Sequence, residues 1–349
     1  MMKGRMMKTR ILILLFAVYM IQPQNSTLAA PTKDTQVIVY TSVDDVFARP
    51  VVSKFQEKTG IQVKLVPDTE ETKSTGLLNR LMTEKIRPQA DVFWSGDPVR
   101  AAILKQKGVS APYHPSATKG LPQLYSDPEG YWTGFSARAR VLLVNKTAFP
   151  KGEAPTSVMD LVNQKYKGKG CIANPLFGTT SMHAAALFQV LGAEKARQFF
   201  NSMTENGVKM VSSNGEVRRR VSGGDCAFGV TDTDDAQQAI REKKPVEIIY
   251  PDRGSMGTLI VPNAAVLIKN GPNPKTGKAF IDYLLSAEIE TMLAESEAAQ
   301  MPVRAGVKAP IHVRSLDSIQ PMQVNYGKLA QELDELSRGF LKEWASWQK

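Results

Sequence analysis

The sequence has little of what catalytic and metal sites usually require. It holds two cysteines and three histidines among its 349 residues. The histidines, His114, His183 and His312, lie at unrelated places without the spacing of metal ligands. No G-x-S-x-G turn, P-loop or H-E-x-x-H helix occurs. These absences weigh against an enzyme. His183 lies early in a predicted helix among alanines, and we expect it to pack in the core and not to bind a metal.

The apolar run near the amino terminus is too short to cross a membrane. Residues 11–21 (ILILLFAVYMI) form a charge-free run of 11 residues, whereas a spanning helix needs about 20. The run follows four basic residues between Lys3 and Arg10 and is followed by small residues that end at Ala30. This pattern predicts a signal peptide over residues 1–30, with a membrane anchor as the alternative. No cysteine stands near the cut, which excludes a lipoprotein anchor there, and we expect a soluble mature chain in the periplasm.

A basic cluster of the kind that binds nucleic acid is also missing. The formal net charge is +10, and cleavage after residue 30 removes four positive charges and leaves +6. The one basic triplet, Arg218-Arg219-Arg220, lies in a helical pattern and is expected to form a solvated face. We therefore expect no nucleic-acid partner.

The two cysteines predict one disulfide if the chain is exported. Cys171 and Cys226 each open an apolar, strand-like run. If these strands are neighbours in a parallel sheet, their starts lie close enough to bridge. The bond would close a loop of 55 residues and stabilise the fold by about 4 kcal/mol at most. Two buried free thiols are the alternative.

Strands and helices alternate along the whole mature chain, which predicts an α/β fold. About 319 residues remain after cleavage, more than one core usually serves, so two lobes are expected. A strand–helix–strand order over residues 37–66 predicts a parallel pair with a right-handed crossover. Pro262 inside the apolar run 258–268 favours an edge or a bend, which suits a passage between lobes. Further strands are expected at 91–94, 140–144, 171–173, 207–211 and 226–230, and helices at 74–86, 98 onward, 184–191, 216–221, 278–285 and 324–347.

Four predicted strands end in short turns of hydroxyl or acidic residues that open a helix. In open parallel sheets, ligands bind beyond the carboxyl ends of the strands, and helix N-termini hold anions. The same residue types are ordinary helix caps, the better explanation for any single turn. If four such turns face one cleft, ligand binding becomes as good an explanation as helix capping. They are Thr41-Ser42-Val43-Asp44, Ser95-Gly96-Asp97, Gly178-Thr179-Thr180-Ser181 and Thr231-Asp232-Thr233-Asp234-Asp235.

Spread in order over residues 37–286, a set of short motifs carries a family resemblance. The mature chain resembles the periplasmic solute-binding proteins of ABC importers. It is most similar to the ferric-iron and thiamine type, a branch of the type 2 periplasmic-binding fold. The motifs are V-I-V-Y-T-S (37–42), F-Q-E-K-T-G-I-Q-V (55–63), A-D-V-F-W-S (90–95), G-F-S-A-R-A-R-V (134–141), N-P-L-F-G-T-T-S (174–181), A-F-G-V-T-D-T-D-D (227–235) and D-Y-L-L-S (282–286).

The resemblance implies two α/β lobes joined by two crossing strands, with the ligand in the cleft between them. Placing the crossings near Arg140 and Val261 gives lobe I as 31–139 plus 262–305 and lobe II as 140–261 plus 306–349. Hinge closure over the ligand then slows its escape. The implied partners are a small-molecule or metal ligand and an ABC permease with its ATPase in the inner membrane. The implied protein is a monomer without a resident cofactor and is not an enzyme.

The sequence departs from the ferric members at the metal ligands. By resemblance, the adjacent tyrosines fall at Thr233 and Asp234, the histidine at Asp44, and the glutamate at Gly96 or Asp97. None of the usual iron ligands is present. Carboxylates are hard oxygen donors and could still hold a hard cation, so whether a metal binds stays open.

The anion-holding turn of the family is intact at Gly178-Thr179-Thr180. Arg138 and Arg140, placed at the lobe crossing, could bind phosphate or carboxylate through paired hydrogen bonds, or form structural ion pairs with cleft aspartates. An anion turn opposite acidic turns suits a bipolar ligand, such as an aminoalkylphosphonate, a sugar phosphate or a thiamine-like compound. If the aspartates only cap helices, a plain anion site remains.

The resulting hypothesis is a transport-binding protein for a small organic phosphate, phosphonate or similar anion. Ferric iron held by carboxylates and a synergistic anion is the first alternative, a secreted enzyme on the same scaffold the second, and a ligand sensor the third. The predicted ligand-binding residues are Thr41, Ser42, Asp44, Ser95, Asp97, Arg138, Gly178, Thr179, Thr180, Thr231, Asp232, Thr233 and Asp234.

Overall fold

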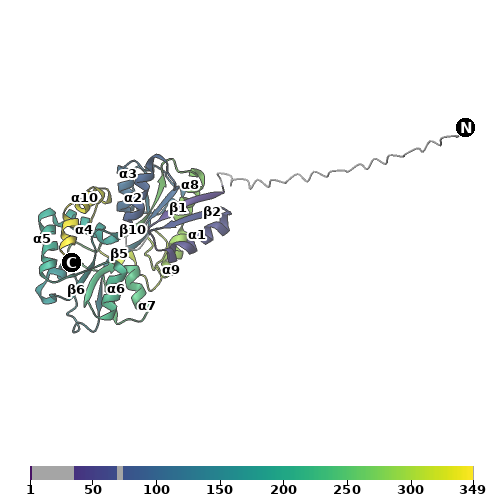
Figure 1. The fold of residues 1–349 in the computed structure, drawn as a ribbon. Coiled ribbons are helices and arrows are strands. Elements are labelled where there is room, and N and C mark those ends of the chain that lie inside the picture. The colour runs from purple at the N-terminus through teal and green to yellow at the C-terminus, as the bar shows by residue number, and fades with distance from the viewer. Residues whose placement is uncertain (2–34, 69–73, 349) are drawn as a thin grey trace.

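The computed structural model describes Met1 and residues 35–68 and 74–348. The predicted signal peptide lies outside this part of the chain. Two α/β halves lie side by side (Figure 1), as the type 2 periplasmic-binding fold predicts. No helix in the described part of the chain has the length and apolarity to cross a bilayer.

The first lobe, as we name it here, is built on strands at one end of the sheet. Strand β1 (Gln36–Thr41) pairs in parallel with β2 (Gln62–Pro67), as predicted, and also with β3 (Val92–Ser95). Strand β10 (Ile260–Ile268) pairs antiparallel to β3 and to the short β4 (Ser110–Ala111). The helices of this lobe are α1 (Asp45–Thr59), α2 (Thr75–Thr83), α3 (Pro98–Gln106), α8 (Pro274–Leu284) and α9 (Ala287–Glu295).

The second lobe contains the other end of the sheet. Strand β6 (Gly170–Ala173) lies between β7 (Lys209–Val211) and β8 (Phe228–Asp232), parallel to both. Strand β9 (Val246–Ile249) pairs with residues 142–145 of a long strand that is described below. The helices are α4 (Gly178–Leu191), α5 (Ala193–Glu205), α6 (Asn214–Gly223) and α7 (Thr233–Arg241). Short 3-10 helices cover Glu84–Ile86, Ser116–Thr118, Gln123–Tyr125, Val158–Val162, Gln164–Tyr166 and Leu316–Ser318.

One long strand, β5 (Thr133–Asn145), belongs to both lobes. Its first part pairs with β10 and its second part with β8, both antiparallel. The sequence analysis predicted a strand only from Arg140, because the preceding residues 133–139 (TGFSARA) are mostly small and include a glycine. All of β5 and β10 is buried. Pro262 was expected to mark an edge or a bend. Strand β10 pairs on both sides, so it is no edge, and its register against β5 shifts between Pro262 and Asn263. The exact lobe bounds given above stay a prediction.

Two helices, α10 and α11, end the described chain. Helix α10 (Tyr326–Arg338) packs against both α3 and α4, and α11 (Phe340–Trp347) places Trp344 against Phe200 of α5. A single helix over 324–347 was predicted. The chain breaks it at Gly339, whose backbone (φ −112°, ψ −110°) is not helical.

The predicted disulfide is not formed in this structure. Strands β6 and β8 are parallel neighbours, as the prediction required. Cys171 opens β6, and Cys226 lies just before β8. Both are buried free thiols, and the pair lies 2.7 Å apart, beyond the bonded distance of about 2.05 Å.

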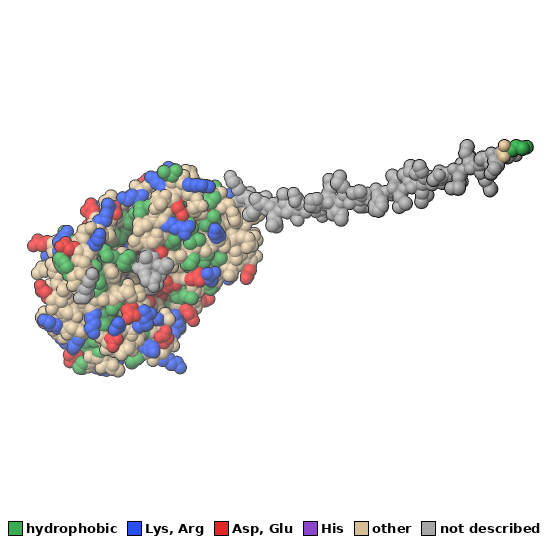
Figure 2. All heavy atoms as spheres, viewed as in Figure 1, with side chains coloured by type: hydrophobic (Ala, Val, Ile, Leu, Met, Phe, Trp, Pro, Cys, Tyr) green, Lys and Arg blue, Asp and Glu red, His purple; other side chains and the backbone are tan. Residues whose placement is uncertain are grey.

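Charged side chains of both signs are interspersed over the face in Figure 2. This face shows no large area of one sign.

Candidate functional site

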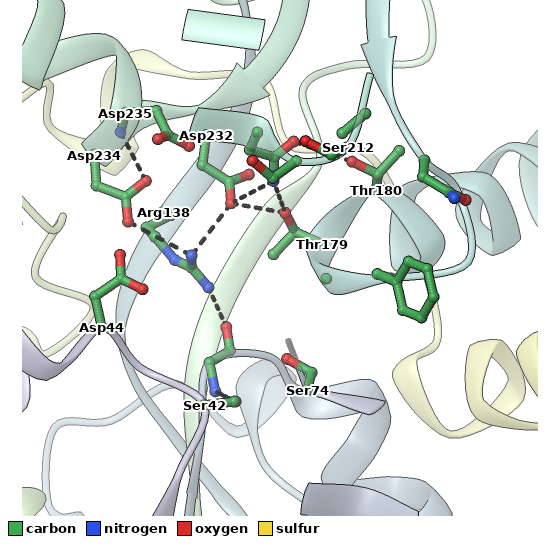
Figure 3. A pocket seen from close by; sticks show the side chains of 17 residues that line it. Ser42, Asp44, Ser74, Arg138, Thr179, Thr180, Ser212, Asp232, Asp234 and Asp235 are labelled. Carbon is green, nitrogen blue, oxygen red and sulfur yellow. Dashed lines mark hydrogen bonds and ion pairs between the residues drawn. The ribbon is translucent and has the colours of Figure 1, made fainter. Parts of the chain in front are cut away.

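A cavity lies between the lobes, where the carboxyl ends of β1, β3, β6 and β8 meet (Figure 3). It encloses about 590 Å³, counting the part open to solvent. This is the position at which open α/β sheets bind ligands. Its lining residues are Ser42, Asp44, Ser74, Gly96, Arg138, Ala173, Asn174, Phe177, Gly178, Thr179, Thr180, Ser212, Ser213, Asn214, Asp232, Asp234 and Asp235.

Two helix N-termini form the second-lobe wall of the cavity. Helix α4 begins at Gly178, and its preceding residue, Phe177, supplies no side-chain cap. Helix α6 begins at Asn214, after Ser213, which caps it by accepting from a backbone N–H. Free N–H groups in the first turns and the positive ends of both helix dipoles favour an anion here.

Hydroxyl and amide side chains join these two helix starts. Asn214 Nδ2 donates to Thr179 Oγ1 at 2.9 Å, and Thr180 Oγ1 donates to Asn214 Oδ1 at 3.0 Å. Thr179 Oγ1 in turn donates to Asp232 Oδ2 at 2.7 Å. The wall is thus a connected hydrogen-bond network with fixed side-chain positions.

Asp232, at the end of β8, is the anchor of this network. Arg140 Nη1 lies 2.8 Å from Asp232 Oδ1, and Arg138 Nη1 lies 3.2 Å from Asp232 Oδ2. Burial opposes ionisation of Asp232, but the guanidinium groups of Arg140 and Arg138 outweigh it and hold the pKa of the carboxyl below its usual value. The structural ion pair considered for both arginines is present.

Arg138 and Arg140 project from the same face of β5 because they are two residues apart on a strand. Arg138 Nη2 also donates to Gly96 O of the first lobe, and Nη1 lies 3.5 Å from Asp234 Oδ2. Burial lowers the pKa of Arg138, but the carboxylates of Asp234 and Asp232 more than offset it, so the pKa is raised. The guanidinium is charged and reaches both walls of the cleft.

The first-lobe wall carries fewer side chains. Ser42 Oγ accepts from Gly96 N at 2.9 Å, which ties the turn after β1 to the turn after β3. Asp44 precedes α1 but makes no side-chain cap bond. Figure 3 shows its carboxylate directed toward Arg138 and Asp234. Asp44 is half-buried and lines the cavity.

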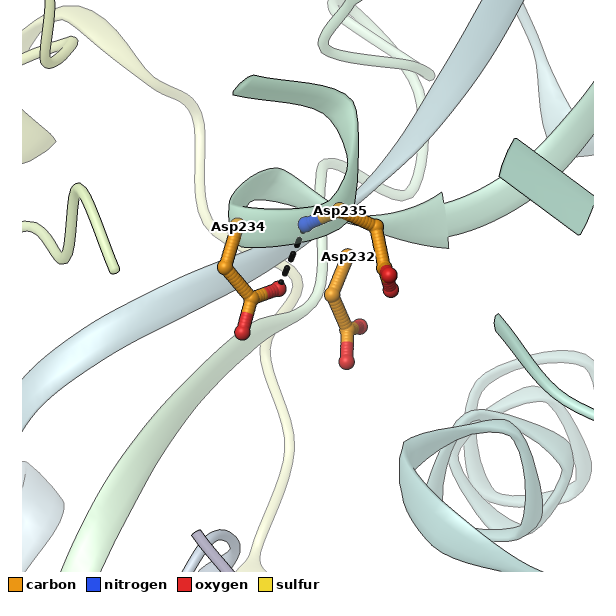
Figure 4. A group of neighbouring side chains, drawn as sticks. All are labelled: Asp232, Asp234 and Asp235. Atoms are coloured by element: carbon orange, nitrogen blue, oxygen red, sulfur yellow. Dashed lines mark hydrogen bonds between the residues drawn. The ribbon is translucent and has the colours of Figure 1, made fainter. Parts of the chain in front are cut away.

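Three aspartates of the second lobe stand close together (Figure 4). One carboxylate oxygen from each of Asp232, Asp234 and Asp235 lies within 4.8 Å of the others. Thr231 Oγ1 donates to Asp235 at 3.0 Å, and Asp234 Oδ1 accepts from Asp235 N at 3.0 Å. Because Arg138 contacts two of the three carboxylates, a metal ion at this place would sit against a guanidinium.

The structure brings most of the predicted site residues together at the cavity. Those that line it are Ser42, Asp44, Arg138, Gly178, Thr179, Thr180, Asp232 and Asp234. The remaining five, Thr41, Ser95, Asp97, Thr231 and Thr233, lie behind this lining.

Those five residues hold the turns in place. Thr41 Oγ1 donates to Trp94 O at 2.9 Å, and Ser95 Oγ donates to Asp97 O at 2.7 Å. Asp97 caps α3 by accepting from Arg100 N. Thr233 Oγ1 accepts from Ala139 N at 3.2 Å. The capping explanation is therefore correct for Asp97, whereas Asp44 and Asp232 make no side-chain cap bond.

Several lining residues were missed. Ser212, Ser213 and Asn214 follow β7 and open α6, so they obey the strand–turn–helix rule that selected the other turns. Applying the rule to the predicted strand 207–211 would have found them. Phe177 and Ser74 carried no sequence signal. His183 is buried in α4, and burial and Arg140 lower its pKa to about 3, so it is neutral and packed, as expected.

The comparisons with known proteins agree with this architecture. Residues 87–324 match the family model described as bacterial extracellular solute-binding protein. Iron uptake protein A1 of Synechocystis sp. is 26% identical over 315 residues, covering 87% of this chain and 85% of that protein. A putative 2-aminoethylphosphonate-binding periplasmic protein of Salmonella paratyphi A is 27% identical over 299 residues, covering 81% of this chain and 84% of that protein.

A solved structure shares the fold. Iron-bound HitA from Pseudomonas aeruginosa superimposes with a TM-score of 0.79 at 23% identity, covering 87% of this chain and 98% of that chain. The predicted family resemblance and fold class are confirmed. With the match over more than two thirds of its length, the chain belongs to the bacterial extracellular solute-binding protein family.

Proposed function

We propose that this protein is exported to the periplasm, captures a small zwitterionic phosphonate and delivers it to an ABC importer. The observation that carries the proposal is the polarity of the cavity. The helix N-termini of α4 and α6 face the cavity from the second lobe, and carboxylates approach it from both lobes.

The phosphonate end fits the turn of Gly178, Thr179 and Thr180. There the ligand would receive backbone N–H groups of α4 together with the side chains of Asn214 and Ser213. Anions bind at such helix starts without any basic side chain. Arg140 stands behind this turn, 3.1 Å from Thr179 Oγ1 and 3.2 Å from Thr180 Oγ1, and adds positive potential.

The charge balance calls for a positive group on the ligand as well. Among the described residues, four carboxylates and one guanidinium line the cavity, Arg140 contacts its hydrogen-bond network, and Arg100 donates to the lining residue Gly178. Because carboxylates outnumber these cations, a plain anion would be repelled. An ammonium group on the ligand, placed near the carboxylates of Asp44 and Asp234, would be attracted by them and would reduce the repulsion. This supports an aminoalkylphosphonate over a sugar phosphate without a positive charge.

Ferric iron is the second candidate, favoured by the cluster of Asp232, Asp234 and Asp235 and by the names of several relatives. Two observations weigh against it. The positions that resemble the family's tyrosine ligands hold Thr233 and Asp234. Arg138 also pairs with two of the three aspartates, so iron would have to displace a guanidinium.

Calorimetric titration with matched probes tests the proposal. We expect 2-aminoethylphosphonate to bind and ethylphosphonate, which lacks the amine, to bind at least about tenfold more weakly, since one charge-assisted bond is lost. Ferric citrate serves as the competing probe. Binding of ferric iron with a charge-transfer colour, or tighter binding of ethylphosphonate than of 2-aminoethylphosphonate, would contradict the zwitterion assignment.

Export also bears on the two cysteines. In an oxidising compartment, we propose that Cys171 and Cys226 join as a disulfide, with an oxidised protein disulfide as the electron acceptor. Their adjacency supports this, because Cys171 on β6 already lies beside Cys226, which stands just before the neighbouring strand β8. The bond would lie at the amino ends of β6 and β8, opposite the cavity, and would stabilise the second lobe without touching the ligand.

A further inference from the structure

A buried arginine joins the two lobes beside the cavity without lining it. Arg100 lies in α3 of the first lobe, and its guanidinium reaches α4 of the second lobe. Its Nη1 donates to Gly178 O at 3.2 Å, and its Nη2 donates to Ser181 Oγ at 2.6 Å. Since Gly178 lines the cavity, Arg100 holds the anion-binding turn from the opposite lobe.

The guanidinium depends on the second lobe for its hydrogen bonds. Arg100 is only 2% exposed. Within its own lobe its ionic partner is Asp97, with Oδ2 3.5 Å from Nη1. Among the described residues, neither Asp97 Oδ2 nor Arg100 Nε has a hydrogen-bond partner. Both side-chain hydrogen bonds of the guanidinium therefore cross the cleft, and separation of the lobes would break both.

We propose that Arg100 is a positioning residue that fastens α4 to the first lobe when the lobes are together, and thereby slows solute release. The proposal rests on the proposed function in one respect, that the solute binds at the first turn of α4. Arg100 acts through this turn and not by touching the solute. Its positive charge also lies next to the positive end of the α4 dipole, which an anion bound at the turn would offset. Solute binding and closure then favour one another.

Small-angle X-ray scattering of the ligand-free protein tests the fastening directly. We expect Arg100→Met to give a larger radius of gyration than the wild type, because the open form gains population. Ser181→Ala should act in the same direction, and the double variant should exceed Arg100→Met by little, since both changes remove one contact. The matched control is Arg80→Met, which removes a guanidinium whose partner, Glu84, lies in the same lobe. An unchanged radius for Arg100→Met would overturn the proposal.

Stopped-flow release of 2-aminoethylphosphonate supplies the second readout. We expect Arg100→Met to raise the dissociation rate constant about 10- to 100-fold, the range for losing charge-assisted hydrogen bonds, with a much smaller change in the association rate constant. Arg100→Lys keeps the positive charge but loses the paired N–H donors of the guanidinium. Its dissociation rate constant should lie between those of the wild type and Arg100→Met. This variant also controls for misfolding of Arg100→Met. Equal dissociation from all three folded proteins would refute the proposal. If the wild type does not bind this probe, the proposed ligand is wrong. The role of Arg100 is still tested, because the scattering comparison needs no ligand.

Discussion

The two walls of the cleft differ in how they are built. The second-lobe wall is a continuous network in which Thr179, Asn214 and Asp232 bond to one another and to two arginines. The first-lobe wall offers a serine that ties two turns together and the half-buried carboxylate of Asp44. A connected network is rigid before the solute arrives, whereas a sparse wall adapts on closure. Substitutions in the second wall should therefore affect folding, and those in the first wall should affect binding alone.

The largest effect is expected at the anchor of the second wall. Replacing Asp232 by Ala leaves the guanidiniums of Arg138 and Arg140 without their shared partner in a buried place. Removing one partner of a buried ion pair costs about 3–5 kcal/mol. Urea unfolding should show a loss of this size. The control is Asp235→Ala, a half-buried position whose loss should cost about 1 kcal/mol. Similar losses for both variants would mean that the network does not anchor the wall.

The next effect concerns the cysteine pair, which belongs to the second lobe alone. Oxidation of Cys171 and Cys226 should raise the free energy of unfolding by about 2–4 kcal/mol, because it constrains the unfolded chain. Thermal unfolding with and without reductant measures this. A Cys226→Ala variant should not respond to reductant. If the wild type, purified from the periplasm, titrates with two free thiols after unfolding, no disulfide forms there.

Acid should lower the stability of the second wall, because it protonates the carboxylate of Asp232. The pKa of Asp232 is lower in the folded protein than its unfolded value of about 3.9, so its contribution to stability is complete above that value. It is lost as the pH falls through the lower, folded pKa. The difference in unfolding free energy between the wild type and Asp232→Asn should accordingly shrink as the pH falls below about 4. A difference that stays constant over this range would show that ionisation of Asp232 does not stabilise the fold.

The smallest effect on stability, with a clear effect on binding, is expected for the first wall. Asp44→Asn should lower the affinity for 2-aminoethylphosphonate about tenfold, because the ammonium group of the ligand loses one ionic partner. Its melting temperature should change less than that of Asp232→Ala, because Asp44 is half-buried whereas Asp232 is buried between two arginines. Asp45→Asn is the control, because Asp45 pairs with Arg49 on the surface of α1. A large loss of stability in Asp44→Asn would erase the distinction between the walls.

Much of the architecture was predictable because it follows from local rules. Alternating strands and helices predicted the parallel β1–β2 pair, and the strand–turn–helix rule located much of the cavity lining. The parallel β6–β8 pair was only a condition of the disulfide prediction, and it is present. The direction of individual side chains was not predictable. The same rule selected Asp97, which caps a helix, and Asp232, which pairs with arginines, since both occupy similar local positions. Which of these outcomes applies depends on residues distant in the sequence, here Arg138 and Arg140 on β5.

The strand shared by the lobes has a consequence for how a solute first arrives. Arg138 and Arg140 stand on β5, which pairs with both lobes and therefore lies close to the axis of any rotation between them. Residues near a rotation axis move least, so an open cleft would keep these guanidiniums close to their present places. The electric field that guides a charged solute inward would then exist before closure, and the association rate would fall with ionic strength.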